Sequence, residues 1–329
     1  MKIVVDAMGS DRAPAVEVEG AVQAVKEYGH EVVLVGDETI VREELKKHED
    51  FGDKITVVHA SERIEMHEPA AISVRRKRKS SIVVGMELLK RDEADGFVSA
   101  GNTGAVVCAA TLSLRLLPGV ERPGIAIVIP TLLGTSVIID VGANIDPKPM
   151  HLLQYGIMAD AYCRYILRKE NPKVGLLNVG EEESKGTDFI KETHTLLSES
   201  KLNFIGNIEG RDIYAGTADI VLCDGFVGNV ILKVSESVID TLVKLLKQEI
   251  KANFVATLGA LLASPAFNTL KKKMDYAEYG GAPLLGVDGR CIISHGSSTP
   301  KAIKNAIRVA ADFKTNDVNR HILEELETY

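Results

Sequence analysis

Short runs of β-branched and aliphatic residues alternate along the chain with longer segments whose apolar residues recur at helical spacing. The short runs predict strands at residues 2–6, 31–35, 54–59, 96–99, 125–129, 136–141, 173–178, 203–205, 220–223, 284–287 and 290–294. The longer segments predict helices at residues 15–28, 39–48, 81–91, 103–117, 151–169, 187–198, 230–252 and 300–315. Asp37 and the pair Ser298–Thr299 can cap helices, and they precede two of these segments. The repeated strand–helix order predicts an α/β fold with a largely parallel sheet and helices on both faces.

The length of 329 residues suits either one large α/β unit or two closely joined lobes. No shift in composition marks a boundary between lobes, and no repeat, low-complexity tract or flexible linker interrupts the pattern. With 45% hydrophobic and 26% charged residues, the composition is that of a globular protein. We therefore treat residues 1–329 as one unit.

The composition also argues against several partners and compartments. Net charge is −7, tryptophan is absent and aromatic residues make up 5%, so we expect no nucleic-acid binding. The four cysteines are far apart and form no CxxC pair, which predicts free thiols in a reducing cytosol. The sequence starts with a predicted strand rather than a signal-peptide pattern, and it has no apolar run long enough to span a bilayer.

Four short polar turns each follow an apolar run and precede a predicted helix. They are, in order, residues 5–11 (VDAMGSD), 99–105 (SAGNTGA), 223–229 (CDGFVGN) and 294–299 (SHGSST). In a parallel sheet the carboxyl ends of the strands open at one edge, so we expect the four turns to lie together. Glycines let the backbone approach a ligand, and helix N-termini offer free N–H groups, so the turns predict a cradle for an anion such as phosphate. The nucleotide motifs GxGxxG and GxxxxGK[ST] are absent.

Two further polar residues are candidates for chemistry. Lys185, in the segment GEEESKG, can supply positive charge to a phosphate or an oxyanion; the alternative is a solvated acidic loop. His295, between a predicted strand and helix, can relay a proton or donate to an oxyanion; the alternative is a hydrogen-bonded turn histidine. Histidines and cysteines show no metal-ligand spacing, so no metal site is predicted.

A run of basic residues points to a binding partner. The basic run Arg75, Arg76, Lys77, Arg78 and Lys79 (RRKRK) is either a solvated helix face or a docking site for an acidic protein or phosphate.

The apolar segment at residues 254–267 is broken at Ser264–Pro265 and followed by three lysines, which favours a helix–loop–helix tip. It is either a core or dimer helix, or a membrane-surface element with Leu258, Leu261, Leu262 and Phe267 as its lipid contacts.

Seven segments in this order carry a family resemblance: IVVDAMGSD, VSAGNTGA, LLNVGEEESKG, FIGNIEGRDI, VLCDGFVGNVILK, YGGAPLLGVDG and SHGSS. Together they closely resemble the bacterial phosphate acyltransferase (PlsX) family of phospholipid synthesis, whose members use acyl carrier protein. The matching segments run from residue 3 to about residue 310. The one small departure is Ser10, where the family usually has glycine (DAMGGD).

The resemblance implies a three-layer α/β fold similar to the isocitrate and isopropylmalate dehydrogenases and the phosphotransacetylases. It implies a homodimeric catalytic unit that needs no cofactor and converts acyl-[acyl carrier protein] and inorganic phosphate into acyl phosphate and free carrier protein. It further implies a cytoplasmic enzyme that associates peripherally with the membrane and supplies a glycerol-3-phosphate acyltransferase there. The basic run then becomes the expected docking site for the acidic carrier protein.

Inorganic phosphate is itself a competent nucleophile, so the site must mainly hold it beside the thioester and stabilise the tetrahedral oxyanion. We predict phosphate and oxyanion contacts from Ser99, Asn102, Thr103, Gly228 and Asn229.

Three more residues complete the predicted chemistry. Lys185 supplies charge, Asp6 orients Lys185 or accepts a phosphate proton, and His295 acts at the leaving thiolate. The alternatives are a phosphotransacetylase that uses acyl-coenzyme A, a metal-dependent 2-hydroxyacid dehydrogenase on the same fold, and a membrane-surface scaffold without catalysis.

Overall fold

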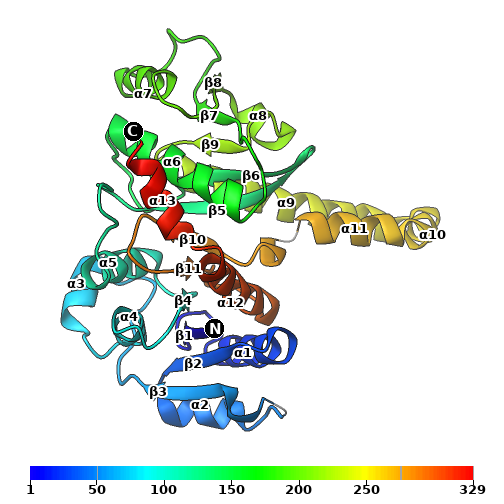
Figure 1. Cartoon of the computed structure of the whole chain (residues 1–329). Coiled ribbons are helices and arrows are strands. Elements are labelled where there is room, and N and C mark those ends of the chain that lie inside the picture. Colours follow the sequence, from blue (N-terminus) through cyan, green and yellow to red (C-terminus); the bar gives the residue numbers. More distant parts are fainter. Residues whose placement is uncertain (50, 275, 329) are drawn as a thin grey trace.

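A single eleven-stranded sheet runs through the protein (Figure 1). The computed structural model describes residues 1–49, 51–274 and 276–328. In spatial order the strands are β3-β2-β1-β4-β11-β10-β5-β6-β9-β7-β8. Their bounds are β1 Lys2–Asp6, β2 Glu31–Gly36, β3 Ile55–His59, β4 Gly96–Ser99, β5 Gly124–Thr131, β6 Gly134–Ile139, β7 Val174–Leu177, β8 Phe204–Ile208, β9 Ile220–Leu222, β10 Ala282–Leu285 and β11 Cys291–Ile293.

The sheet is mostly parallel, but its direction reverses in the middle. The pairs β11–β10, β10–β5 and β5–β6 are antiparallel, and the other neighbours are parallel. Three successive reversals make β6, β9, β7 and β8 run opposite to β1, β2, β3, β4 and β11. The two strand groups therefore form oppositely directed halves of the sheet, and each half has its own row of carboxyl strand ends.

Helices cover both faces, as the sequence pattern predicts. Side chains alternate between the faces along each strand: Val4 of β1 packs in the cluster that contains α4, whereas Ile3 and Val5 pack in the cluster that contains α1 and α12. Helices α3, α4, α5, α8 and the start of α9 lie on the first face. Helices α1, α2 and α12 cover one half of the second face, and α6, α7 and α13 cover the other half. The three-layer α/β architecture is confirmed.

The helices are α1 Ala15–Tyr28, α2 Glu38–Leu45, α3 Ala70–Arg76, α4 Ser81–Lys90, α5 Thr103–Ser113, α6 Pro149–Tyr165, α7 Asp188–Ser198, α8 Gly210–Ala215, α9 Gly225–Ala252, α10 Phe254–Leu262, α11 Ser264–Met274, α12 Pro300–Thr315 and α13 Val318–Leu326, with short 3-10 turns at Gly52–Lys54 and Tyr276–Glu278. Two predicted helix starts are confirmed: Asp37 accepts the N–H groups of Thr39 and Ile40, and Thr299 accepts that of Ala302. Every predicted strand is present within a few residues, whereas α3, α8 and α13 were not predicted.

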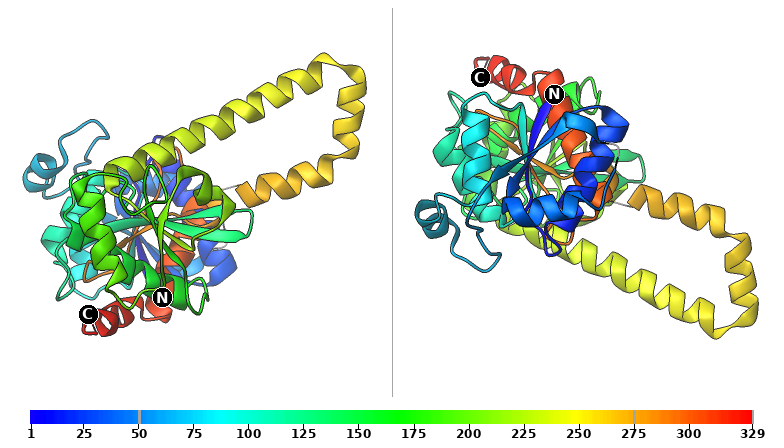
Figure 2. Two further views of the ribbon diagram at one scale, coloured as in Figure 1. Left: turned by 90° about the horizontal axis from the view of Figure 1, so that it is seen from above. Right: turned by 90° about the horizontal axis from the view of Figure 1, so that it is seen from below.

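Helices α9, α10 and α11 form an arm that projects from the body of the molecule (Figures 1 and 2). Helix α9 has 28 residues, of which only Gly225 and Gly228 are buried, at its base. Asn253 caps α10 by accepting the N–H groups of Val255 and Ala256, so the chain turns sharply at the far end of the arm. The N-terminal part of α9 packs on the sheet, and the rest extends beyond it.

Candidate active site

The first and second polar turns are joined by a buried carboxylate. The Ser99 hydroxyl donates to Asp6 Oδ2 at 2.7 Å, and Asp6 Oδ1 accepts the Met8 N–H at 3.1 Å. Ser99 also accepts the Gly101 N–H at 3.0 Å. Burial raises the pKa of Asp6, although hydrogen bonds from Ser81 and Ser99 oppose the rise. Asp6 is 1% exposed, so in this structure it braces the strand ends from within.

The fourth turn joins the first through backbone contacts. The Asp11 N–H donates to the carbonyl oxygen of Gly296 at 2.9 Å. A Cβ atom on Gly9 would lie 2.6 Å from the Gly101 nitrogen, so the first and second turns touch there. Because β1, β4 and β11 are parallel neighbours, these three turns form one surface, which we name the three-turn site.

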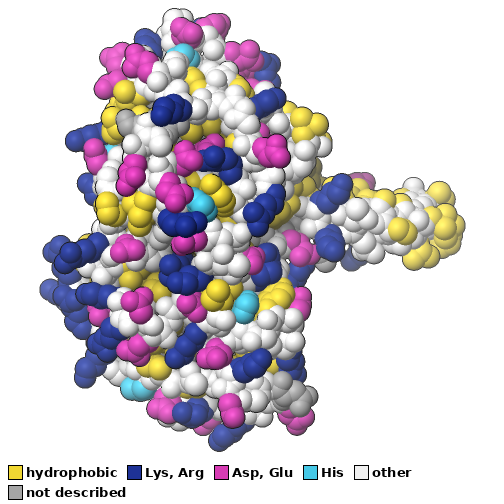
Figure 3. Space-filling model, viewed as in Figure 1, with side chains coloured by type: hydrophobic (Ala, Val, Ile, Leu, Met, Phe, Trp, Pro, Cys, Tyr) yellow, Lys and Arg dark blue, Asp and Glu magenta, His cyan; other side chains and the backbone are white. Residues whose placement is uncertain are grey.

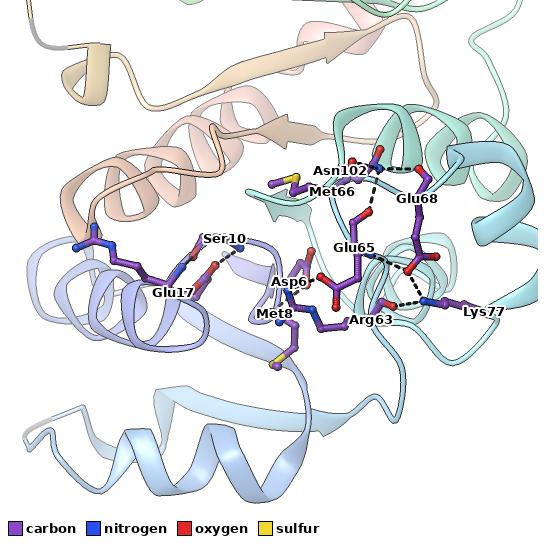
Figure 4. Close-up of polar contacts among 11 residues, drawn as sticks. Asp6, Met8, Ser10, Glu17, Arg63, Glu65, Met66, Glu68, Lys77 and Asn102 are labelled. Carbon is purple, nitrogen blue, oxygen red and sulfur yellow. Dashed lines mark hydrogen bonds and ion pairs between the residues drawn. The ribbon is translucent and has the colours of Figure 1, made fainter. Parts of the chain in front are cut away.

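Asn102 links the three-turn site to the loop at residues 61–69. Its Oδ1 accepts the Ala105 N–H and caps α5, while its Nδ2 donates to the carbonyl oxygens of Glu65, Met66 and Glu68 at 3.1–3.2 Å (Figure 4). The side chain thus holds this loop over the second turn. An anion could bind the Asn102 side chain only if one of these contacts broke, so its predicted anion contact stays a prediction, as does that of the fully buried Ser99.

The start of α5 offers free donors at the three-turn site. Thr103 is exposed and occupies the first position of α5. Asn102 caps only the Ala105 N–H, and the hydrogen bonds of the described residues include none to the N–H groups of Thr103 and Gly104. Such N–H groups, with the positive end of the helix dipole, suit an anion.

His295 is exposed at the same surface, and its tautomer follows from its neighbours. Its Nδ1 accepts the Ser297 N–H at 3.2 Å and lies 2.7 Å from the Ser297 hydroxyl. A ring nitrogen that accepts an N–H bears no proton, so neutral His295 carries its proton on Nε2. Its Nε2–H is therefore a donor, as the predicted oxyanion role requires.

Two arginines near the three-turn site were missed by the sequence analysis. Arg12 donates from Nη2 to the Ser298 carbonyl oxygen at 3.2 Å, and Arg63 pairs with Glu65 at 2.7 Å and lowers the pKa of Asp6 electrostatically (Figure 4). Arg12 directly follows the DAMGSD motif, so the motif could have identified it as a candidate site residue. Arg63 belongs to a loop without any motif, so only the fold brings it here.

The third turn belongs to the reversed half of the sheet, because it follows β9, which runs opposite to β1, β4 and β11. Among the described residues no hydrogen bond joins it to the other three turns, so the prediction that all four lie together stays a prediction. Gly228 is buried for a packing reason: a Cβ atom there would lie 2.0 Å from the Asp140 carbonyl oxygen. Its N–H already donates to the Asp224 carbonyl oxygen at 2.9 Å, and the predicted anion contact of Gly228 stays a prediction. Asn229 is exposed beside Gly142.

Lys185 follows β7, in the same half of the sheet as the third turn, and it is exposed. Asp6 is bonded to Ser99 and Met8, and among the described residues no hydrogen bond joins it to Lys185, so the prediction that Asp6 orients Lys185 stays a prediction. Neighbouring Glu181 pairs with Arg211 at 2.8 Å instead of with Lys185. The hydrogen bonds and ion pairs of residues 1–49, 51–274 and 276–328 include none to the Lys185 ammonium group, so this charge is open to a ligand.

The basic run follows and partly forms α3. Arg75, Arg76, Arg78 and Lys79 are exposed, and Figure 3 shows Lys and Arg side chains gathered over this part of the surface. Lys77 differs, because it pairs with Glu68 at 2.5 Å and donates to the Arg63 carbonyl oxygen at 2.8 Å. The run therefore presents four exposed basic side chains, which have no ion-pair partner among the described residues, beside the loop that Asn102 holds.

The end of the arm is exposed and apolar (Figure 3). Helices α10 and α11 meet at Ala263, next to the predicted break. The four side chains proposed as lipid contacts are exposed: Leu258 by 53%, Leu261 by 69%, Leu262 by 78% and Phe267 by 39%. Within the described residues, no helix is long and apolar enough to cross a membrane.

Comparisons with known proteins match nearly the whole chain. Residues 1–321 match the family described as "Fatty acid synthesis protein". The chain is 51% identical to the phosphate acyltransferase of Geotalea uraniireducens over 327 residues, which cover 99% of this chain and 94% of that protein. It is 49% identical to the phosphate acyltransferase of Aquifex aeolicus over 329 residues, which cover 100% and 97%.

Solved structures share the fold at low sequence identity. A phosphotransacetylase from Streptococcus pyogenes superposes with a TM-score of 0.65 at 21% identity, covering 94% of this chain and 93% of that one. A 4-hydroxythreonine-4-phosphate dehydrogenase from Klebsiella pneumoniae gives a TM-score of 0.53 at 12% identity, covering 95% and 99%.

The full-length relatives define the molecule as an acyltransferase on a fold shared with phosphotransacetylases and dehydrogenases. The chain belongs to the phosphate acyltransferase (PlsX) family, whose motifs it carries from the first turn to the fourth. The resemblance noted in the sequence is thereby confirmed.

Proposed function

We propose that this enzyme transfers the acyl group of a long-chain acyl-[acyl carrier protein] to inorganic phosphate, and that the acyl phosphate serves phospholipid synthesis. One observation carries the choice of phosphate: the first, second and fourth turns meet where the α5 N-terminus, Arg12, Arg63 and His295 offer positive charge and donors. Family membership supports the acyl transfer.

The proposed reaction needs no covalent enzyme intermediate. A phosphate oxygen, held at the N–H groups of Thr103 and Gly104, attacks the thioester carbonyl carbon. The C–O bond forms, the carbonyl oxygen becomes an oxyanion, and His295 Nε2–H donates a hydrogen bond to it. The C–S bond then breaks, and the thiolate leaves with the carrier protein and takes up a proton. One well-placed donor of this kind contributes about 3 kcal/mol to transition-state stabilisation.

The half of the sheet that carries β7 and β9 has a proposed part as well. Lys185 and Asn229 are exposed polar residues there, and the Lys185 ammonium group has no hydrogen-bond or ion-pair partner among the described residues. We propose that Lys185 supplies positive charge to the phosphate or to the acyl phosphate product, and that Asn229 is a polar contact. These roles rest on the chemistry of the two side chains, because no hydrogen bond or ion pair of the described residues joins them to the three-turn site.

The partners are proposed from surface chemistry. The four exposed basic side chains of the basic run suit the acidic carrier protein. The exposed end of the arm suits the interface of a bilayer, which would bring the enzyme near a glycerol-3-phosphate acyltransferase. We further propose a homodimer in the cytoplasm, and no cofactor or metal in the reaction.

Phosphate-dependent release of free thiol tests the proposal. We expect release from palmitoyl-[acyl carrier protein] but little from acetyl-coenzyme A, and we expect the KM for the carrier to rise steeply between low and high salt. Preference for acetyl-coenzyme A would make the enzyme a phosphotransacetylase, and reduction of NAD with an added divalent metal would make it a dehydrogenase.

The Lys185→Ala variant, with Lys191→Ala as its control on α7, tests the proposed role of Lys185 in the same assay. We expect Lys185→Ala to lose at least about tenfold in kcat at saturating phosphate, since a charged partner typically contributes at least this much. Lys191 is exposed on α7, so its variant should turn over like the wild type. Near-full turnover of Lys185→Ala would remove Lys185 from the mechanism.

A further inference from the structure

A buried carboxyl group lies directly behind the first turn, and the proposed mechanism does not use it. Glu17, in the first turn of α1, is 0% exposed. Its Oε1 accepts the Ser10 N–H at 2.8 Å (Figure 4). Its Oε2 is buried and has no hydrogen-bond partner among the described residues. Glu17 thus holds the turn from its helix side.

Ser10 and Arg12 connect Glu17 to the fourth turn through hydrogen bonds. Its hydroxyl oxygen accepts the Arg12 N–H at 3.3 Å, and the Arg12 guanidinium donates to the Ser298 carbonyl oxygen. The neighbouring Asp11 N–H donates to Gly296, next to His295. A continuous series of hydrogen bonds therefore runs from Glu17 through Ser10 to the turn that carries His295.

The link depends on a residue in which this chain departs from its family motif. The motif usually reads DAMGGD, and a glycine at position 10 would keep the N–H that Glu17 accepts but has no hydroxyl group to accept the Arg12 N–H. Ser10 is 2% exposed, so its hydroxyl group faces the interior and is not a substrate contact. The contact between the Ser10 hydroxyl oxygen and the Arg12 N–H, which continues the series from Glu17, is thus a property of this sequence.

We propose that Glu17 is a positioning residue for phosphate binding: it holds Ser10, and through Ser10 it fixes the first and fourth turns against each other. The inference rests on the proposed phosphate site. It adds a residue that touches no substrate but sets the geometry of two turns that do.

The charge of Glu17 gives this role a pH signature. Burial raises the pKa of Glu17 to about 7, so the group is neutral below this pH and ionised above it. Ionisation places a buried negative charge near Asp6, behind the surface proposed to bind phosphate. Asp11 and Arg12 are the charged residues that directly follow Ser10. On α12, which packs against α1, the basic side chains of Lys301 and Lys304 pair with Glu278 and Glu27. Phosphate binding should therefore weaken above pH 7.

The test measures phosphate binding by calorimetry between pH 6 and 8.5 in the wild type and in Glu17→Gln, with Glu19→Gln on exposed α1 surface as the control. The titration of phosphate itself is common to all three proteins. We expect the Kd of the wild type and of Glu19→Gln to rise about tenfold more over this range than that of Glu17→Gln, because a charge behind the site repels the anion. Parallel curves for wild type and Glu17→Gln would overturn the inference, and so would a wild type that binds no phosphate.

A second variant separates positioning from charge. The amide oxygen of Glu17→Gln can still accept the Ser10 N–H, whereas Glu17→Val has no acceptor. Glu17→Val should bind phosphate at least about fivefold more weakly at every pH, while its unfolding midpoint reports whether the fold is intact. Wild-type affinity in folded Glu17→Val would refute positioning. A wild type that binds phosphate but releases no thiol would refute the proposed function and leave this inference standing.

Discussion

Single polar side chains hold the three-turn site together from within. Ser99 and Asp6 join two strand ends, and Asn102 joins the second turn to the loop at residues 61–69. The sequence correctly places these residues near a site, because they follow strand ends. Their hydrogen-bond partners could not be predicted, since those partners come from a loop that no motif marks.

The Asn102→Ala variant measures this internal bonding. The change leaves three carbonyl groups and the Ala105 N–H without their partner, so we expect a loss of about 3 kcal/mol in the free energy of unfolding. Urea denaturation measures the loss. Asn203→Ala is the matched control, because its side chain makes one surface hydrogen bond to the Asn171 carbonyl oxygen, and it should cost less than about 1 kcal/mol. Equal losses in both variants would contradict the stabilising role of the Asn102 hydrogen bonds.

At the scale of elements, β-branched runs predicted all eleven strands because buried strands need apolar side chains on both faces. The direction of the strands was not predictable from periodicity. The hairpin between β5 and β6 and the two antiparallel pairings of β10 reverse half of the sheet, and pairing order is a long-range property. The third turn follows β9 and therefore belongs to the reversed half. Helices α3 and α8, of seven and six residues, are too short to show a helical period.

Alanine substitutions of two glycines in the arm helices are predicted to change the free energy of unfolding in opposite directions. Gly228→Ala would place a methyl group 2.0 Å from the Asp140 carbonyl oxygen, and backbone atoms on both sides cannot yield, so we expect a loss above about 3 kcal/mol. A methyl group added at Gly259 in α10 would have nothing within 4 Å, so Gly259→Ala should gain up to about 1 kcal/mol from helix propensity. Thermal unfolding of both variants checks the pair. A tolerated Gly228→Ala would show that α9 can shift on the sheet.

At the scale of the whole molecule, the body and the arm differ in what they expose. The body buries its apolar residues in three clusters around the sheet, whereas the arm exposes leucines and phenylalanines at its far end. An apolar end beside Lys272 and Lys273 suits an anionic bilayer surface.

Sedimentation with anionic liposomes tests this surface. The double variant Leu261→Glu, Leu262→Glu adds two negative charges where the side chains would enter lipid, so we expect membrane binding to fall at least about tenfold. The control Leu132→Glu, Leu133→Glu changes two leucines that are 87% and 81% exposed on the β5–β6 hairpin, and it should sediment like the wild type. Undiminished binding of the first variant would return the segment to a protein-interface role.

The base of α9 packs closely on the segment after β6, where Gly228 meets the Asp140 carbonyl oxygen. A straight helix of 28 residues spans about 42 Å, so the far end of the arm is well separated from this contact. If the far end binds a bilayer, the length of α9 limits how far the membrane surface and the body of the molecule can be apart.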